Sequence, residues 1–262
     1  MTAPVRPALL AAPAAALAAT FTAALAAALA SVAGAAHAGP SDYVFSPIVE
    51  EGEREIDFKA GTARARDGAR TNKESIGLGW GVNATWFTEV YAIWHKEPGA
   101  RHGFDAWEWE NKFQLTPTGK YPVDLGLIVE IERPKDRSEG YELVWGPLLQ
   151  ADLSADVQAN ANLLFSRHLR SEGSAAAALG YQWQLKYRWR PAVEIGAQGF
   201  GDLGPWRHWA SSAAQSHVLG PAVFGKLRME QGFTVKYNAA LLLGTGGAAP
   251  RQTLRVQAEL EF

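Results

Sequence analysis

The sequence predicts an all-β fold, an antiparallel up-and-down barrel of about twelve strands, with ten or fourteen strands as alternatives. Three observations support this prediction. Apolar and polar residues alternate with a period of two along most of the chain, as in strands with two different faces. The connections between these segments alternate between short and long. No helix-length crossover separates them, so neighbouring strands are expected to run antiparallel.

The alternating segments define the expected strands. They lie at 54–62, 75–82, 85–95, 105–115, 121–132, 141–153, 157–167, 179–189, 192–200, 217–229, 234–243 and 253–262. Longer connections lie near 65–72, 97–103, 133–139, 168–175, 202–215 and 245–250, and tight ones lie near Asn83, 116–120, 154–156, 190–191 and 230–232. This alternation predicts a barrel whose two rims face different surroundings.

The register of the third expected strand, 85–95, is ambiguous in the sequence. The favoured register places Glu89 inward, with Trp86, Val90 and Trp94 on the outward face. The competing outward set is Phe87, Tyr91 and Ile93. A one-residue shift moves every side chain of a strand to the other face, so the two registers exclude each other.

The amino-terminal region is not expected to belong to the barrel. Residues 1–38 are rich in Ala and Leu, carry Arg6 as their only charge and end in the sequence AHA. This pattern predicts a secretory signal peptide cleaved after Ala38, with an uncleaved membrane anchor as the alternative. We expect residues 39–51 to form an N-terminal periplasmic segment and residues 52–262 to form the barrel.

Composition excludes several classes of function. The chain has no cysteine, which rules out disulfides, thiolate metal sites and cysteine nucleophiles. Removing Arg6 from its 25 basic residues leaves 24 against 27 acidic ones, so no basic excess favours nucleic acid as a partner. After residue 38 no run of 18 apolar residues is present, and no transmembrane helix is predicted. We predict no cofactor, no metal and no catalytic residue.

The two faces of the strands favour a transmembrane barrel over a soluble sandwich. The apolar faces carry aromatic residues near their ends, among them Trp107, Trp145, Trp183, Tyr187, Trp189 and Phe262, and Trp and Tyr are enriched at membrane interfaces. The opposite faces carry too many charges for a dry protein core. A sheet that spans a bilayer must close on itself, so we expect the apolar face to contact lipid and the polar face to line a lumen.

The chain ends in LRVQAELEF, and this strand resembles the last strand of Gram-negative outer-membrane β-barrel proteins. The stretches WEWENKFQL and LGPAVFGKL also resemble parts of a porin-like proteobacterial family. The resemblance implies export to the outer membrane, contact with outer-membrane lipid and recognition by the barrel-assembly machinery. The implied recognition residues are Leu254, Val256, Ala258, Leu260 and Phe262. The oligomeric state stays open.

Charges on the expected lumen face segregate around the barrel. The acidic side comprises Glu108, Glu110, Asp124, Glu130, Glu132 and Glu142. The basic side comprises Lys186, Arg188, Lys226, Arg228, Lys236 and Arg255. The first strand adds Glu55, Asp57 and Lys59. Opposed charged walls create a field that favours polar or zwitterionic solutes, so we predict a porin-like channel for passive passage of small polar or charged solutes.

Two alternatives to the channel remain from the sequence. The charges could instead form a closed ion-pair network in a structural or interaction barrel with a plugged lumen. Asn162, Ser166 and His168 share one expected strand face and resemble the Ser, His and Asn residues of outer-membrane phospholipases, which makes an outer-membrane hydrolase the third possibility. Their spacing of about 7 Å on one face argues against direct hydrogen bonds.

Two smaller patterns also have more than one interpretation. Gly77, Gly79 and Gly81 lie on one face of a strand, where they clear space for a solute path or for a bulky partner such as Tyr91 or Arg54, or allow sheet curvature. The histidines near the long connections, densest in HKEPGARHGFD, suggest a metal site only weakly.

Overall fold

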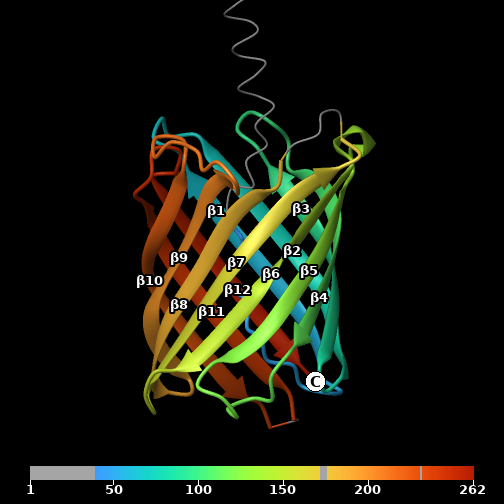
Figure 1. Cartoon of the computed structure of the whole chain (residues 1–262), viewed down its shortest axis with the longest axis vertical. Helices are drawn as coiled ribbons and strands as arrows, with labels where there is room; N and C mark the ends of the chain where they lie inside the picture. The colour runs from blue at the N-terminus through green and yellow to red at the C-terminus, as the bar shows by residue number, and fades with distance from the viewer. Residues whose placement is uncertain (1–38, 172–175, 231) are drawn as a thin grey trace, which may run out of the picture. The chain divides into compact units, whose positions relative to one another are not determined.

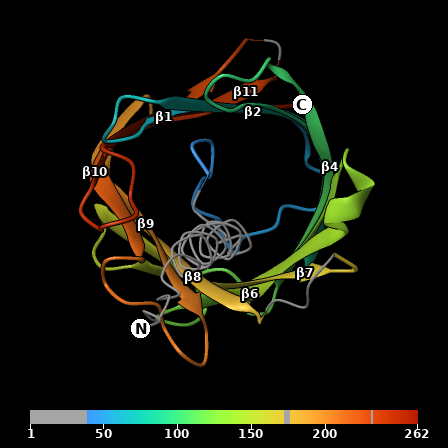
Figure 2. The same ribbon diagram turned by 90° about the horizontal axis from the view of Figure 1, so that it is seen from above.

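The computed structural model describes residues 39–171, 176–230 and 232–262. Within these residues, twelve antiparallel strands form one closed barrel (Figures 1 and 2), which confirms the predicted fold class. The strands are β1 (Arg54–Arg64), β2 (Arg70–Asn83), β3 (Trp86–Lys96), β4 (Gly103–Gln114), β5 (Asp124–Pro134), β6 (Tyr141–Asp152), β7 (Val157–Leu169), β8 (Ala178–Arg190), β9 (Val193–Pro205), β10 (Ser216–Arg228), β11 (Thr234–Gly244) and β12 (Gln252–Glu261). A short 3-10 helix, Arg137–Glu139, lies between β5 and β6.

The barrel closes between its first and last strands. β1 pairs with β12 in an antiparallel ladder that joins Glu55 to Glu261 and Arg64 to Gln252. The backbone N–H of Phe262 extends this ladder by donating to the Arg54 carbonyl at 2.9 Å. Each strand therefore has two partners, as a spanning sheet requires. Among the described residues, no helix is long and apolar enough to cross a membrane.

The two rims differ in their connections, and one predicted connection is wrong. We call the rim with the turns at 84–85, 153–156 and 191–192 the short-turn rim and the other the long-loop rim. The tight connection predicted at 116–120 is instead a loop over 115–123 at the short-turn rim. It is held by the Gly119 N–H, which donates to Asp124 at 2.8 Å, so β5 begins three residues later than predicted.

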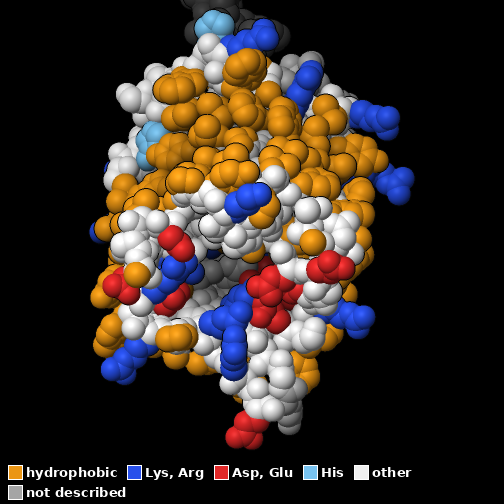
Figure 3. Space-filling view, turned by 60° about the horizontal axis from the view of Figure 1, so that its bottom comes forward, with side chains coloured by type: hydrophobic (Ala, Val, Ile, Leu, Met, Phe, Trp, Pro, Cys, Tyr) orange, Lys and Arg blue, Asp and Glu red, His pale blue; other side chains and the backbone are white. Residues whose placement is uncertain are grey.

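The outer wall of the barrel is apolar, and its opening is charged. Leu254, Val256 and Phe262 of the last strand segment are exposed to the surroundings. Figure 3 shows apolar side chains covering the wall, while charged ones gather around the opening that comes forward. This division matches the predicted assignment of the apolar stripe to lipid.

A polar pair on the outer wall is covered by two tryptophans. Thr88 and Asn111 are only 3% and 8% exposed, and Thr88 donates to Asn111 at 3.0 Å. The Trp86 indole donates to Asn111 at 3.0 Å and the Trp109 indole donates to Thr88 at 2.9 Å. Both oxygens are thus satisfied without water, which lipid contact demands.

The structure resolves the register of β3. Val90 is exposed on the outer wall and Glu89 is buried inside, both as the favoured register predicts. Phe87, Tyr91 and Ile93 lie on the same inward face as Glu89 and are each at most 2% exposed. Large apolar side chains therefore fill part of the lumen, as the favoured register implies and the competing register does not.

Glycines of β2 make room for these inward side chains. A Cβ atom on Gly77 would lie 2.4 Å from both Tyr91 Cε1 and Glu89 Oε1, and one on Gly79 would lie 2.5 Å from Phe87 Cζ. Of the interpretations left open for these glycines, the structure supports the bulky partner, and that partner includes Tyr91 but not Arg54.

Replacing Gly77 with alanine should destabilise the barrel. The added methyl must displace Tyr91 or Glu89 in a packed interior, and such overpacking costs about 1–3 kcal/mol. Urea unfolding of the protein in lipid vesicles measures this loss. Gly103→Ala is the matched control, since nothing lies within 4 Å of its Cβ position, and a loss of equal size there would contradict the explanation.

Candidate functional site: the barrel lumen

The amino-terminal residues of the described chain lie inside the barrel. Figure 2, a view down the barrel, shows this segment crossing the enclosed space before it joins β1. Phe45, Pro47 and Val49 are buried. The prediction of a periplasmic segment at 39–51 is therefore corrected, because these residues pack against the inner face of the strands. We call residues 39–53 the inner segment.

Hydrogen bonds hold the inner segment to several strands. The Tyr43 hydroxyl donates to Glu110 of β4 at 2.6 Å, and the Val49 N–H donates to Gln114 at 2.7 Å. Asn162 of β7 donates to the Phe45 carbonyl at 3.1 Å. Polar side chains of the lumen thus satisfy backbone groups that an irregular buried segment leaves unpaired.

Three strand glycines match the path of the inner segment. A Cβ atom on Gly61 would lie 1.8 Å from the Pro40 carbonyl oxygen, and one on Gly81 would lie 1.9 Å from the Glu50 carbonyl oxygen. A Cβ atom on Gly126 would lie 2.8 Å from Pro47 Cβ. Any larger residue at the first two positions would displace backbone. The wall is shaped for this segment.

Apolar contacts anchor the middle of the inner segment. Phe45 packs with Ile128 and Leu148, both fully buried on the inward faces of β5 and β6. On the other side, Val44 packs against a cluster of buried residues from β9 to β11 that includes Phe200. The inner segment therefore fills the lumen between two opposite parts of the wall.

Lys59 fixes the inner segment from β1. Its ammonium lies 3.6 Å from the ring centres of both Tyr43 and Tyr91. It also forms an ion pair with Asp57 at 3.5 Å. Desolvated cation–π contacts of this kind are worth up to about 2 kcal/mol each, so Lys59 links β1, β3 and the inner segment.

A cavity of about 170 Å³ borders the inner segment. Gly39, Ser41, Asp42 and Tyr43 line one side of it. The strands contribute glutamates from β4, β5 and β6, namely Glu108, Glu130, Glu132 and Glu142, and the lysines Lys59 and Lys73. Lys73 forms an ion pair with Glu132 at 3.7 Å. Burial raises the pKa of the Asp42 carboxyl, and the neighbouring Lys73 opposes this shift.

The predicted acidic residues occupy three different places. Glu108, Glu130, Glu132 and Glu142 meet at the cavity. Glu110 instead accepts the Tyr43 hydroxyl, and Asp124 accepts a backbone N–H at the short-turn rim. The glutamates form two clusters in which the carboxylate oxygens lie close enough together to share a cation. One cluster comprises Glu108, Glu110 and Glu130, and the other lies at the mouth described below.

The predicted basic residues do not form one wall opposite the cavity. Lys186 pairs with Glu194 at 3.5 Å, and Arg188 pairs with Asp152 at 2.8 Å. Arg228 is exposed at the end of β10. The cations that face the cavity glutamates are Lys59 and Lys73. Lys73 lies outside the predicted strand, which begins at residue 75, although its alternation with Ser75 and Gly77 indicates an inward position.

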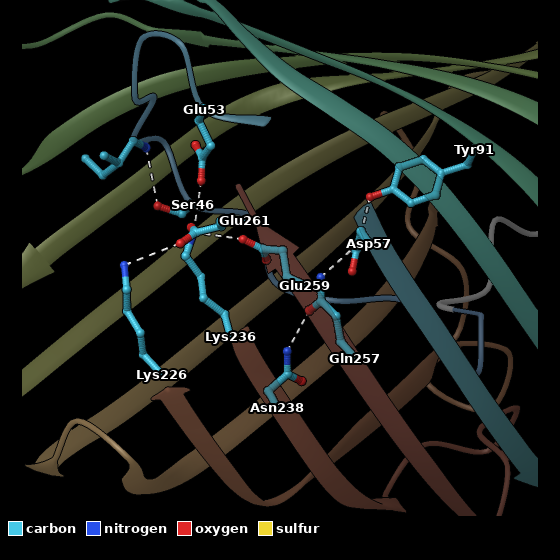
Figure 4. A network of polar contacts seen from close by, with 11 residues as sticks. Ser46, Glu53, Asp57, Tyr91, Lys226, Lys236, Asn238, Gln257, Glu259 and Glu261 are labelled. Carbon is cyan, nitrogen blue, oxygen red and sulfur yellow. Dashed lines mark hydrogen bonds and ion pairs between the residues drawn. The ribbon is translucent and has the colours of Figure 1, made fainter. Parts of the chain in front are cut away.

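Glu53, Glu259 and Glu261 surround Lys236 at the mouth of the short-turn rim (Figure 4). Lys236 lies 3.1 Å from Glu53 and 2.8 Å from Glu259, and it also pairs with Glu261. Glu55 completes the group. Lys226 adds a pair with Glu261 at 3.6 Å. Lys226 and Lys236 therefore neutralise part of the acidic mouth rather than facing the cavity.

The candidate residues for hydrolysis and for metal binding are engaged in other contacts. Asn162 is used by Phe45 and Gln182, and the nearest carboxylate to His168 is Glu142 at 4.0 Å. In the outer patch, His95 contacts Glu97 through Nε2 at 3.1 Å and Asp105 through Nδ1 at 3.4 Å. Glu97 and Asp105 therefore lie at opposite nitrogens of the His95 ring, so they cannot bind one metal ion together with this histidine.

The barrel is similar to two solved outer-membrane structures. One is an outer-membrane channel from Pseudomonas putida F1, with 10% identity, coverage of 86% of this chain and 99% of that chain, and a TM-score of 0.57. The other is the translocator domain of the autotransporter NalP from Neisseria meningitidis, with 10% identity, coverage of 95% and 97%, and a TM-score of 0.50. The fold is that of a Gram-negative outer-membrane β-barrel. No protein-family model and no curated protein matches the sequence.

This fold orients the barrel and supports a location in the outer membrane. Barrels of this kind have short periplasmic turns and longer extracellular loops. We therefore expect the short-turn rim, with the C-terminus and the glutamate mouth, to face the periplasm. Leu254, Val256, Ala258, Leu260 and Phe262 lie in or directly after β12 beside β1, and their recognition by the assembly machinery stays a prediction.

Replacing Tyr43 with phenylalanine should loosen the inner segment without unfolding the barrel. The change keeps the ring beside Lys59 and removes the hydrogen bond to Glu110, which is worth about 1.5–3 kcal/mol when the acceptor is charged. Hydrogen exchange of the amides in residues 39–53 should accelerate roughly tenfold or more. Tyr121→Phe changes an exposed ring and should leave exchange unchanged. Equal protection in both variants would contradict the anchoring role of Tyr43.

Proposed function

We propose that the protein is a porin-like channel for passive passage of small polar or charged solutes, narrowed by its own inner segment. The observation that carries this proposal is the charged cavity enclosed by the barrel. A dry structural core would not retain Glu108, Glu130, Glu132 and Glu142 around an open space, because unpaired buried charges are costly. Water and polar solutes in the lumen provide the solvation that these groups need.

The charge balance of the cavity sets an ionic preference. Asp42 and the four cavity glutamates face only two cations, Lys59 and Lys73. An excess of carboxylates in a low-dielectric channel attracts cations and repels simple anions. The channel should therefore conduct small cations in preference to small anions, and the adjacent lysines provide partners for solutes that carry both signs of charge.

The inner segment determines the width of the path. It crosses the lumen and packs against β5 and β6 through Phe45 and against the β9–β11 wall through Val44. Twelve strands lie between the eight of filled barrels and the sixteen to eighteen of open porins, so a segment of this size strongly reduces the free cross-section. The same contacts favour a plugged structural barrel as the second candidate.

Ionic selectivity tests the channel. In planar bilayers the mature protein should give small, cation-preferring currents, and Glu130→Gln combined with Glu132→Gln and Glu142→Gln should move the reversal potential in a salt gradient towards zero. Glu139→Gln is the matched control, since Glu139 lies exposed in the 3-10 helix outside the lumen. A parent protein that is silent in bilayers, or a shift of equal size in the control, would reject the proposal.

Shortening the inner segment separates the two candidates. Deletion of residues 43–48 removes its contacts with Glu110, Ile128 and Leu148 and leaves the predicted processing site and β1 intact. We expect conductance to increase several-fold if the segment narrows a channel. Deletion of the exposed loop residues 98–101 is the control, and heat-modifiable migration in gels confirms closure in both variants. A closed barrel that stays silent after deletion of 43–48 would favour the structural role.

A further inference from the structure

One buried cation in the lumen has no hydrogen-bond partner among the described residues. Arg255 of β12 points inward and is 2% exposed. Its Nε, Nη1 and Nη2 atoms form no hydrogen bond within the described part of the chain. The lumenal lysines Lys59, Lys73, Lys186 and Lys236 each form an ion pair with a carboxylate, and Lys112, which is only half-buried, lies over the Phe87 ring. Arg255 is the exception among these inward-facing groups.

The surroundings of Arg255 position its guanidinium without satisfying it. The guanidinium carbon lies 4.9 Å from the ring centre of Phe200, so the aromatic face covers one side. Asp42 acts on it electrostatically, but Oδ2 of Asp42 accepts the Gly39 N–H at 2.8 Å. A buried guanidinium with five donors and no acceptor is very costly, which indicates that another group occupies this place in the working protein.

Small strand residues and the inner segment surround Arg255. Its register partners are Gly61 on β1 and Ala240 on β11, and Ala222 pairs with Ala240 on the next strand. The inner segment fills the space above Gly61, since a Cβ atom there would lie 1.8 Å from the Pro40 carbonyl oxygen. Phe200, whose ring lies beside the guanidinium, and Asp42, which acts on it electrostatically, both line the cavity, so one layer of side chains separates Arg255 from it.

The opposite part of the wall has the complementary charge. In a ring of twelve strands β12 lies across from β6, and the cavity glutamates are on β4, β5 and β6. A solute in the cavity thus has the carboxylates of the glutamates on one side. On its other side, the Arg255 guanidinium lies behind Phe200 and Asp42. Arginine binds carboxylates through two parallel N–H···O bonds and is suited to planar anionic groups.

We propose that Arg255, once the covering side chains of Phe200 and Asp42 move aside, binds the carboxylate of a small zwitterionic solute whose ammonium group is attracted by the cavity glutamates. This inference deepens the proposed function by naming the class of solute, and it rests on that function for the route of entry. It also reconciles a cation-preferring lumen with an unpaired arginine, because a zwitterion meets both charges while a simple anion is repelled by the glutamates.

Calorimetric titration of the full mature barrel in detergent tests the site. The probes are 4-aminobutanoate and butanoate, which differ only in the ammonium group. We expect the parent to bind 4-aminobutanoate more tightly than butanoate and Arg255→Gln to weaken that binding roughly tenfold or more, as loss of a charged hydrogen-bonded pair implies. Arg255→Lys keeps the charge without the planar fork and should bind with intermediate strength.

Lys186→Gln is the matched control, since it removes a lumenal cation that already pairs with Glu194, and it should bind 4-aminobutanoate like the parent. Heat-modifiable migration establishes that each variant is folded, and Arg255→Lys carries the test if Arg255→Gln does not close. Absence of binding by the parent, parent-like binding by Arg255→Gln or an equal loss in Lys186→Gln would overturn the assignment. A barrel that is silent in bilayers yet binds 4-aminobutanoate through Arg255 would reject the channel and keep the site.

Discussion

The hydrocarbon of the bilayer offers no hydrogen bonds to a backbone, and the whole structure depends on this constraint. Every spanning strand must have two partners, so β1 pairs with β12 and the sheet closes. Closure then creates an enclosed space, and the apolar side chains that point outward to lipid cannot fill it. Even the polar pair Thr88 and Asn111 on the outer wall is covered by tryptophan indoles, which shows how strictly lipid contact is enforced.

The enclosed space is occupied by the chain itself. The inner segment lies against glycines of β1, β2 and β5 and is fixed by Tyr43, Phe45 and Lys59. Backbone groups of an irregular segment need polar partners, and the lumen supplies them from Gln114 and Asn162. A polar barrel interior is thus suited to bind an internal segment that has no regular secondary structure.

Charges in the lumen are organised locally rather than as two opposed walls. The glutamates of β4 to β6 face Lys59 and Lys73 across the cavity, whereas Lys226 and Lys236 balance the periplasmic mouth. Each group reduces the cost of enclosing charge by pairing at close range. Arg255 departs from this arrangement, since none of its side-chain nitrogens has a hydrogen-bond partner among the described residues.

The sequence by itself indicated about twelve strands, their antiparallel order and the faces of most of them, because a period of two is a local property of the chain and closure follows from the bilayer. It also identified the inward glutamates, since they alternate with apolar residues. Only the tertiary structure placed the inner segment in the lumen, decided between the two registers of β3 and separated Lys236 from the cavity. These features depend on contacts between residues far apart in the chain, such as Tyr43 with Glu110, and no local pattern encodes such contacts.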